Sequence, residues 1–312
     1  MNIISLWDIN YLSKGLALYE SLCNSIDGGF RFSVLCIDDE TMKWFNDNIY
    51  NIQGKRNGII VYESLTDMEK SEQHGAELKS MRELPATLYG DQRSNYLWIL
   101  APWWIRHNLS LVKEGESVLY SDSDLMWYKS PQFIINELGD KHVSVHTHRF
   151  SCSFDEYINN PKQITGWFNV GAVLIRNTPE GLAVADRWKH LCNTNIDPFH
   201  ARWGACGDQS WLTQVYIELK QHFHVFDDTL AHLAPWTEFP EQFKSNDMCV
   251  FKGKEQPILF THFSHFQYDL SNGTWKDNDH GEWLPSARSE VRDYYQRYFE
   301  LICECHTKYK IV

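Results

Sequence analysis

The stretch that decides the fold is residues 117–131, SVLYSDSDLMWYKSP. An apolar run at 117–120 leads into Asp122 and Asp124, and a second apolar run follows them. Side chains at positions i and i+2 of an extended chain point to the same side. Two carboxylates placed in this way repel each other, and their burial is costly unless a cation lies between them. The stretch therefore suggests a metal site at the end of a strand.

The pattern around this stretch predicts an α/β fold. Apolar runs at 3–7, 31–38, 57–63 and 117–120 alternate with segments of helical spacing, such as 11–23 and 40–49. This alternation is typical of a parallel sheet covered by helices on both faces, in which ligands bind beyond the carboxyl ends of the strands. Asp8, Asp38 and Asp122 each follow an apolar run. Polar side chains thus lie where a ligand site is expected.

The rest of the chain continues the same pattern. We expect a buried helix at 94–109 that is interrupted near Pro102, strands at 167–177 and 256–263, and helices at 179–192 and 287–305. No linker rich in Pro, Gly or Ser divides the chain. We therefore expect one domain over residues 1–270, with the loop and helix of residues 271–312 packed on it.

Composition narrows the class of partner. The chain has 312 residues and a formal net charge of -12, which argues against a nucleic-acid partner because such binding depends on Lys and Arg at phosphates. Its 13 Trp exceed what packing normally needs, and surplus aromatic residues often line grooves that bind sugars. Eight scattered Cys without a CxxC pair predict reduced thiols in a cytoplasmic protein. We expect neither a signal peptide nor a membrane span, although an acceptor in a membrane is compatible with the sequence.

A bare pair of aspartates is weak evidence for a metal, since Asp277 and Asp279 repeat the spacing in a polar stretch. The position of Asp122 and Asp124 after a strand makes them the stronger pair. His262 follows a further apolar run, and an imidazole added to oxygen ligands shifts the expected metal from Mg²⁺ toward Mn²⁺. A single histidine on an apolar strand is more often a core residue. Its combination with the aspartates favours a ligand.

Such a metal site suggests a nucleotide-linked substrate. The sequence contains neither GxxxxGK[ST] nor GxGxxG, so a glycine-rich loop is not expected to hold phosphates. A bound metal would then neutralise the charge of a diphosphate. Because few protein side chains bind this metal, some of its coordination positions stay open to the phosphate oxygens.

Several segments together resemble the GT-A glycosyltransferases of the glycogenin and bacterial lipopolysaccharide galactosyltransferase type (family 8-like). The matching segments follow the order of that family: SLWDINYLSKGLALYESL, FSVLCID, LYSDSDLMW, WFNVGAVLIRN, GDQSWLTQ and LFTHF. The resemblance spans residues 3 to 266 and implies a GT-A fold, Rossmann-like, with a mostly parallel sheet. It also implies a metal-dependent transfer of a sugar from a UDP-hexose to a hydroxyl acceptor, with retention of anomeric configuration.

The resemblance implies a role for each matching residue. Three contact the base and ribose of the donor: Asp8, Asn10 and Tyr11. Three hold Mn²⁺ or Mg²⁺: Asp122, Asp124 and His262. Four lie at the sugar, the first two also approaching the acceptor: Asn169, Gly171, Asp208 and Gln209. The chain departs from the family after the histidine, where a diphosphate-binding lysine is missing, and Arg93 and Lys276 are candidate substitutes.

Simpler interpretations of the same residues stay open. Asp8 and Asp208 can each cap a helix, Gly171 can be a packing glycine, and Trp236 can belong to the core or stack on an acceptor sugar. Other functions also remain: a nucleotidyltransferase, a phosphatase or a non-catalytic sugar-nucleotide-binding protein. Phosphatases that use paired aspartates carry them after the first strand, where this chain has Asp8 and Asn10.

Overall fold

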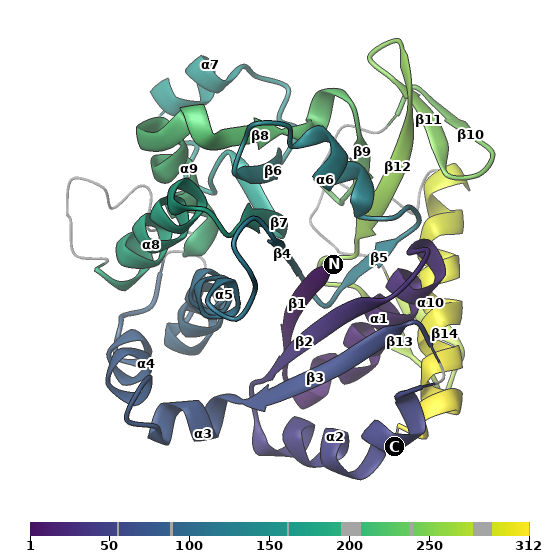
Figure 1. Ribbon diagram of the computed structural model, residues 1–312. Coiled ribbons are helices and arrows are strands. Elements are labelled where there is room, and N and C mark those ends of the chain that lie inside the picture. The colour runs from purple at the N-terminus through teal and green to yellow at the C-terminus, as the bar shows by residue number, and fades with distance from the viewer. Residues whose placement is uncertain are drawn as a thin grey trace.

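The computed structural model describes residues 1–54, 56–87, 90–160, 162–194, 207–236, 240–276 and 289–311. Its central element is a seven-stranded sheet of order β3-β2-β1-β4-β7-β6-β8 (Figure 1). The strands are β1 (Asn2–Trp7), β2 (Phe30–Cys36), β3 (Gly58–Ser64), β4 (Ser117–Ser121), β6 (Val143–Thr147), β7 (Phe168–Arg176) and β8 (Phe223–Val225). The first four are parallel, and β7 is antiparallel to both neighbours. The predicted mostly parallel sheet is confirmed.

Helices cover both faces of this sheet. Successive side chains of each strand point to opposite faces, so each strand contributes apolar residues to two cores. Ile3 of β1 and Leu119 of β4 join the core on one face, whereas Ile4 and Val118 join the core on the other. The first core includes residues of α1 (Leu12–Ser25), α2 (Asp39–Ile52) and α10 (Ser289–Tyr309). The second core includes α3 (Leu65–Lys70), α4 (Gly75–Arg82), α5 (Gln92–Leu109), α8 (Pro179–Asn193) and α9 (Asp208–Leu219). The short helices α6 (Gln132–Glu137) and α7 (Phe154–Asn159) complete the set in the described ranges.

A second sheet brings a late segment of the chain to the aspartate pair. Its strands are β5 (Leu125–Trp127), β9 (Ala231–Leu233), β10 (Gln242–Lys244), β11 (Met248–Phe251) and β12 (Lys254–His262). Strand β12 runs antiparallel to β5, with His262 opposite Leu125. The end of β12 therefore lies directly beside Asp124. A small hairpin of β13 (Gln267–Asp269) and β14 (Thr274–Lys276) follows.

The helix expected to be interrupted near Pro102 is continuous from Gln92 to Leu109. Proline removes one backbone donor and disfavours a straight helix. Here Trp103, Trp104 and Ile105 are buried in the core directly after the proline, and this packing holds the second half of the helix in line. The expectation of an interruption was wrong because tertiary packing outweighs the local preference.

The C-terminal helix α10 packs on α1 and on the end of β12. The His306 Nε2 lies 2.9 Å from the Ser13 hydroxyl, and Lys308 pairs with Glu20 at 2.6 Å. The rings of Tyr298 and Phe263 stack with centroids 4.0 Å apart. The helical tail is confirmed, while the division at residue 270 stays a prediction.

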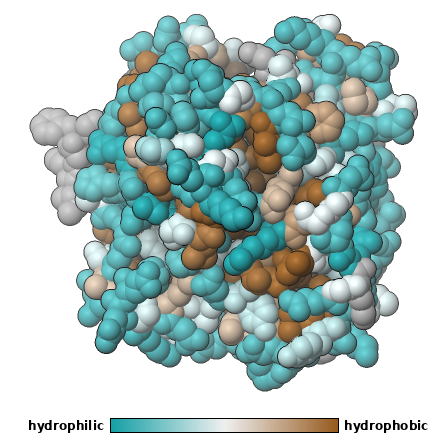
Figure 2. Space-filling view, viewed as in Figure 1, coloured by the Kyte–Doolittle hydropathy of each residue, from teal (hydrophilic) through white to brown (hydrophobic). Residues whose placement is uncertain are grey.

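The surface shown in Figure 2 is mostly hydrophilic, with smaller groups of apolar residues in the middle of the face. Among the helices in the described ranges, none is both long and apolar enough to cross a membrane. The seven described cysteines form no disulfide with one another, and the eighth, Cys206, lies outside the described residues, as do Asp277 and Asp279.

The approach of α1 to β1 gives a first prediction. A Cβ added at Gly15 would lie 2.2 Å from the ring of Trp7, which is 1% exposed. Gly15→Ala should destabilise the protein by about 2–3 kcal/mol, because overpacking outweighs the gain in helix propensity. Urea unfolding measures this difference. Gly29→Ala, where the nearest atom is 3.7 Å away, is the matched control and should change stability little. Equal effects of the two variants would contradict the packing argument.

Candidate active site at the carboxyl edge of the sheet

The turn after β4 sets the positions of the two aspartates. The Asp122 amide donates to the Gly171 carbonyl at 2.8 Å, which extends the pairing of β4 with β7 by one residue. The chain then turns, and the Phe263 amide donates to the Asp124 carbonyl at 2.9 Å. Asp122 is therefore tied to the first sheet and Asp124 to the second.

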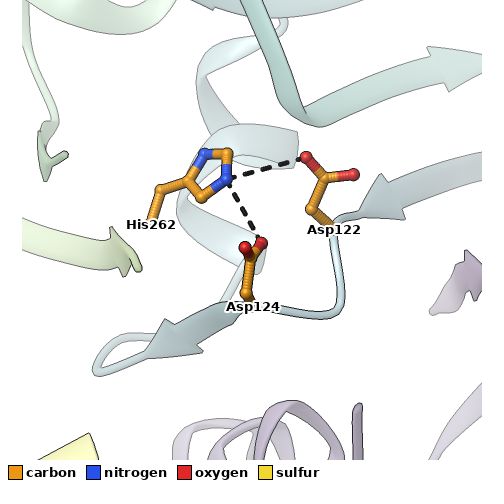
Figure 3. A group of neighbouring side chains, drawn as sticks. All are labelled: Asp122, Asp124 and His262. Carbon is orange, nitrogen blue, oxygen red and sulfur yellow. Dashed lines mark ion pairs between the residues drawn. The ribbon is translucent and has the colours of Figure 1, made fainter. Parts of the chain in front are cut away.

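Three side chains converge at this turn (Figure 3). His262 Nε2 lies 3.2 Å from Asp124 Oδ1 and 3.8 Å from Asp122 Oδ2. One ligand atom from each residue lies within 4.8 Å of the other two. Ligand atoms about 2.1 Å from one octahedral ion are separated by about 3 Å in cis and about 4 Å in trans. The three side chains therefore fit one divalent cation with small adjustments.

Asn169 and Gly171 hold the histidine in the orientation that a metal needs. Asn169 Oδ1 accepts the Gly171 amide at 2.9 Å and lies 3.3 Å from His262 Nδ1. With its proton on Nδ1, the ring turns the lone pair of Nε2 toward the aspartates, as outer hydrogen bonds do for metal-bound histidines. A Cβ at Gly171 would lie 2.8 Å from both His262 Nδ1 and Asn169 Oδ1. The glycine is thus required by the histidine packed against it.

The charges of the three groups are strongly coupled. Burial raises the pKa of Asp122 to about 6, with a further rise from Asp124. Burial also disfavours the charge of Asp124, but His262 and Lys14 outweigh it and lower the pKa of Asp124 to about 2. Burial would lower the pKa of His262, but the two aspartates raise it. Without a metal, the two aspartates therefore favour the protonated form of His262.

The residues after β1 lie at the same edge of the sheet as Asp122, because β1 and β4 are parallel neighbours. Asp8 Oδ1 accepts the Tyr11 amide at 3.2 Å, so Asp8 caps the short turn Ile9–Tyr11, and its Oδ2 lies 3.4 Å from Arg93. Burial and the charges of Asp124, Asp8 and Asp122 raise the pKa of the Tyr11 hydroxyl to about 12. The charges of Asp122 and Asp124 therefore reach the Tyr11 hydroxyl. The Asn10 side chain is exposed to solvent.

Asp208 is the first residue of α9 and is 4% exposed. Its Oδ1 accepts the Gln209 amide at 2.9 Å, while Gly207 occupies the capping position. Burial and the charge of Asp122 raise the pKa of Asp208 well above its usual range. Asp208 thus lies within the electrostatic reach of Asp122. The alternative that Asp208 is the N-cap of α9 is therefore wrong.

Sequence reasoning missed His148, which connects Gln209 to Asn169 and through Asn169 to His262. The His148 Nε2 lies 3.5 Å from Asn169 Nδ2, and the ring also hydrogen bonds the Gln209 side chain. Burial lowers the pKa of His148 to about 4, so the ring is neutral. Trp236 packs edge-on against His262, with centroids 5.2 Å apart, and against His148. The only signal for His148 was its position just after an apolar run.

A candidate metal-ligand set at the carboxyl edge of a mostly parallel sheet is compatible with an enzyme that binds a nucleotide-linked substrate through a cation. The model of the nucleotide-diphospho-sugar transferase family matches residues 103–270, more than half of the chain. The chain belongs to this family and is a glycosyltransferase.

The chain is also similar to a curated relative and to solved structures. The uncharacterized protein YfnD of Bacillus subtilis (strain 168) is 25% identical over 263 residues, which cover 82% of this chain and 75% of YfnD. Mouse xyloside xylosyltransferase 1 is 13% identical with a TM-score of 0.54, over 85% of this chain and 97% of that one. Galactosyltransferase LgtC, solved with donor and acceptor sugar analogs, is 14% identical with a TM-score of 0.51, over 97% and 96%. At these identities the two structures show a shared GT-A fold.

Gly171→Ala should weaken Mn²⁺ binding by about 10-fold or more, because the new methyl group displaces the His262 ring from its position beside the aspartates. The loss of the electron paramagnetic resonance signal of free Mn²⁺ on binding measures the affinity. Urea unfolding in a chelator separates this effect from a general loss of stability. Unchanged Mn²⁺ affinity in a folded variant would show that the ring does not need this space.

Asp208→Asn should stabilise the metal-free protein at neutral pH by about 1–2 kcal/mol. The raised pKa of Asp208 means that the folded state keeps a proton that the unfolded chain releases above about pH 4, so stability of the wild type falls as the pH rises. The asparagine removes this loss, and its advantage should be larger at pH 8 than at pH 5.

Urea unfolding at the two pH values tests this prediction. The matched control is Asp140→Asn, where the side chain is 89% exposed and no such pH dependence is expected. An advantage that is independent of pH would mean that Asp208 is ionised in the folded protein.

Proposed function

We propose that this glycosyltransferase moves a hexose from a UDP-hexose to a hydroxyl acceptor with the help of Mn²⁺ or Mg²⁺, retaining the anomeric configuration. The observation that carries the proposal is the convergence of Asp122, Asp124 and His262 in a member of the nucleotide-diphospho-sugar transferase family. A cation bound there supplies a Lewis acid that neutralises the diphosphate of the donor. The mixed oxygen and nitrogen ligands favour Mn²⁺.

The donor lies in this proposal along the ends of β1 and β4. Asp8, Asn10 and Tyr11 contact the base and ribose, and Arg93 pairs with Asp8 at 3.4 Å. The exposure of Asn10 and the 39% exposure of Tyr11 leave both side chains accessible to a ligand. The partial exposure of Tyr11 next to three aspartates supports a stacking role for its ring.

The sugar lies between the metal ligands and the start of α9. Gln209 and Asp208 orient it there, and Asn169 keeps His262 in place while Gly171 leaves room for the ring. Trp236 faces the same region and is proposed to contact the acceptor sugar, since its Nε1 has no partner among the described residues.

Retention is supported by the surroundings of Asp208. An inverting enzyme needs an ionised carboxylate that reaches the acceptor hydroxyl. Asp208 is buried, and burial disfavours its ionised form. In the retaining alternative the departing phosphate oxygen takes the proton of the acceptor, so no protein base is required. The acceptor is proposed to be a glycan or another hydroxyl compound, free or in a membrane, and the free cysteines favour the cytoplasm as the compartment.

Isothermal titration with UDP tests the donor site. The wild type should bind UDP with micromolar affinity in Mn²⁺ and far more weakly after the metal is chelated. Asp124→Asn should lose metal-dependent binding, because a neutral amide is a poor ligand for a divalent cation. Asp140→Asn is the matched control for a change of charge away from the site.

A panel of UDP-sugars assayed for slow hydrolysis then identifies the hexose, and the anomer released from the preferred donor tests retention. Absence of binding by UDP, in a folded protein with Mn²⁺ present, would reject UDP as the nucleotide. An inverted product would reject the retaining course.

A further inference from the structure

The charge balance of the site leaves the donor without a partner for part of its diphosphate. Asp122 and Asp124 together cancel the charge of one divalent cation. The diphosphate then adds negative charge, and more develops when its bond to the sugar breaks. Arg93 is occupied by Asp8, and its side chain is 67% exposed. A further cation is therefore needed close to the metal ligands.

Lys14 occupies the first turn of α1, three residues after Tyr11, and is only 7% exposed. Its Nζ lies 4.7 Å from the centroid of the Tyr11 ring. No described carboxylate lies within the 4.0 Å of an ion pair with this ammonium. A lysine is rarely buried without a partner, because its charge loses hydration.

The field of Lys14 reaches the metal ligands. Its charge lowers the pKa of Asp124 and opposes the protonation of His262, while Asp124 in turn favours the charged form of Lys14. Burial lowers the pKa of Lys14 itself. The ammonium lies beside Tyr11, proposed to contact the base and ribose, on a helix that packs against β5, the strand that begins directly after Asp124.

We propose that Lys14 contacts the diphosphate of the nucleotide donor and neutralises the charge that develops on it during transfer. In that step the bond between the sugar C1 and the phosphate oxygen breaks, and its electron pair stays on that oxygen. The acceptor oxygen forms the new bond to C1, and its proton passes to the departing phosphate oxygen. Lys14 remains protonated throughout, so it acts by electrostatic stabilisation. This inference rests on the proposed UDP-dependent function.

The test compares UDP with uridine in isothermal titrations at saturating Mn²⁺. Lys14→Met keeps the apolar stem and removes the charge. It should weaken UDP binding by about 10- to 100-fold and leave uridine binding unchanged, because only UDP carries the phosphates. Lys14→Arg should retain most of the UDP affinity. Lys43→Met, on the surface of α2, is the matched control and should have no effect.

Each outcome distinguishes this inference from the proposed function. Equal weakening of UDP and uridine would show that Lys14 only supports the fold, and unchanged UDP affinity in Lys14→Met would show that it does not contact the phosphates; either result overturns the inference and leaves the donor site intact. A wild type that fails to bind UDP rejects the proposed function and this inference with it. Mn²⁺ binding without nucleotide should be unchanged or tighter in Lys14→Met, because a positive charge near Asp124 is lost.

Discussion

The antiparallel pairing of β5 with β12 is the contact on which the site depends. It places His262 opposite Leu125, and so beside Asp124, although 138 positions of numbering separate the histidine from that aspartate. Neither sheet alone brings the three ligands together, since Asp122 follows a strand of the first and His262 ends a strand of the second. The hydrogen bond from the Phe263 amide to the Asp124 carbonyl fixes the junction between them. The site is therefore a property of how the two sheets meet.

The same junction is electrostatically unfavourable without a ligand. The buried groups Asp124, Asp208 and Lys14 lie within electrostatic reach of one another or of Asp122, whose side chain is partly exposed. The pKa of Asp122 is raised by burial while that of Asp124 is lowered by His262 and Lys14, so the protein compensates the two carboxylates unequally. Groups with such perturbed pKa values are typical of functional sites, where a bound ion or substrate completes the balance. We interpret the unequally compensated charges of this region as suited to the binding of a cation and an anionic donor.

Much of the fold could be predicted from the sequence because its signals are local. The apolar runs that became β1, β2 and β4 lead into Asp8, Asp38 and Asp122, and the periodicity of 287–305 is that of α10. The aspartate pair and His262 followed from the same pattern together with the family resemblance. The antiparallel direction of β7 and the strands β6, β8 and β9 were not foreseen, because strand direction and short strands depend on pairing partners far along the chain.

The missed residues are those whose importance is set by three-dimensional surroundings. In the sequence, Lys14 looks like an ordinary surface lysine of an amphipathic helix. Only the packing of α1 against β5 and α10 shows that it is buried. His148 likewise gains its meaning from Asn169. Gly171 shows the converse: the sequence marked it either as a residue near the substrate or as a packing glycine, and the structure gives it a steric reason through His262. If the proposed roles hold, Gly171 admits the ring of a metal ligand and Lys14 approaches the donor's diphosphate, so both residues place charge beside the aspartates without filling the space that the donor needs.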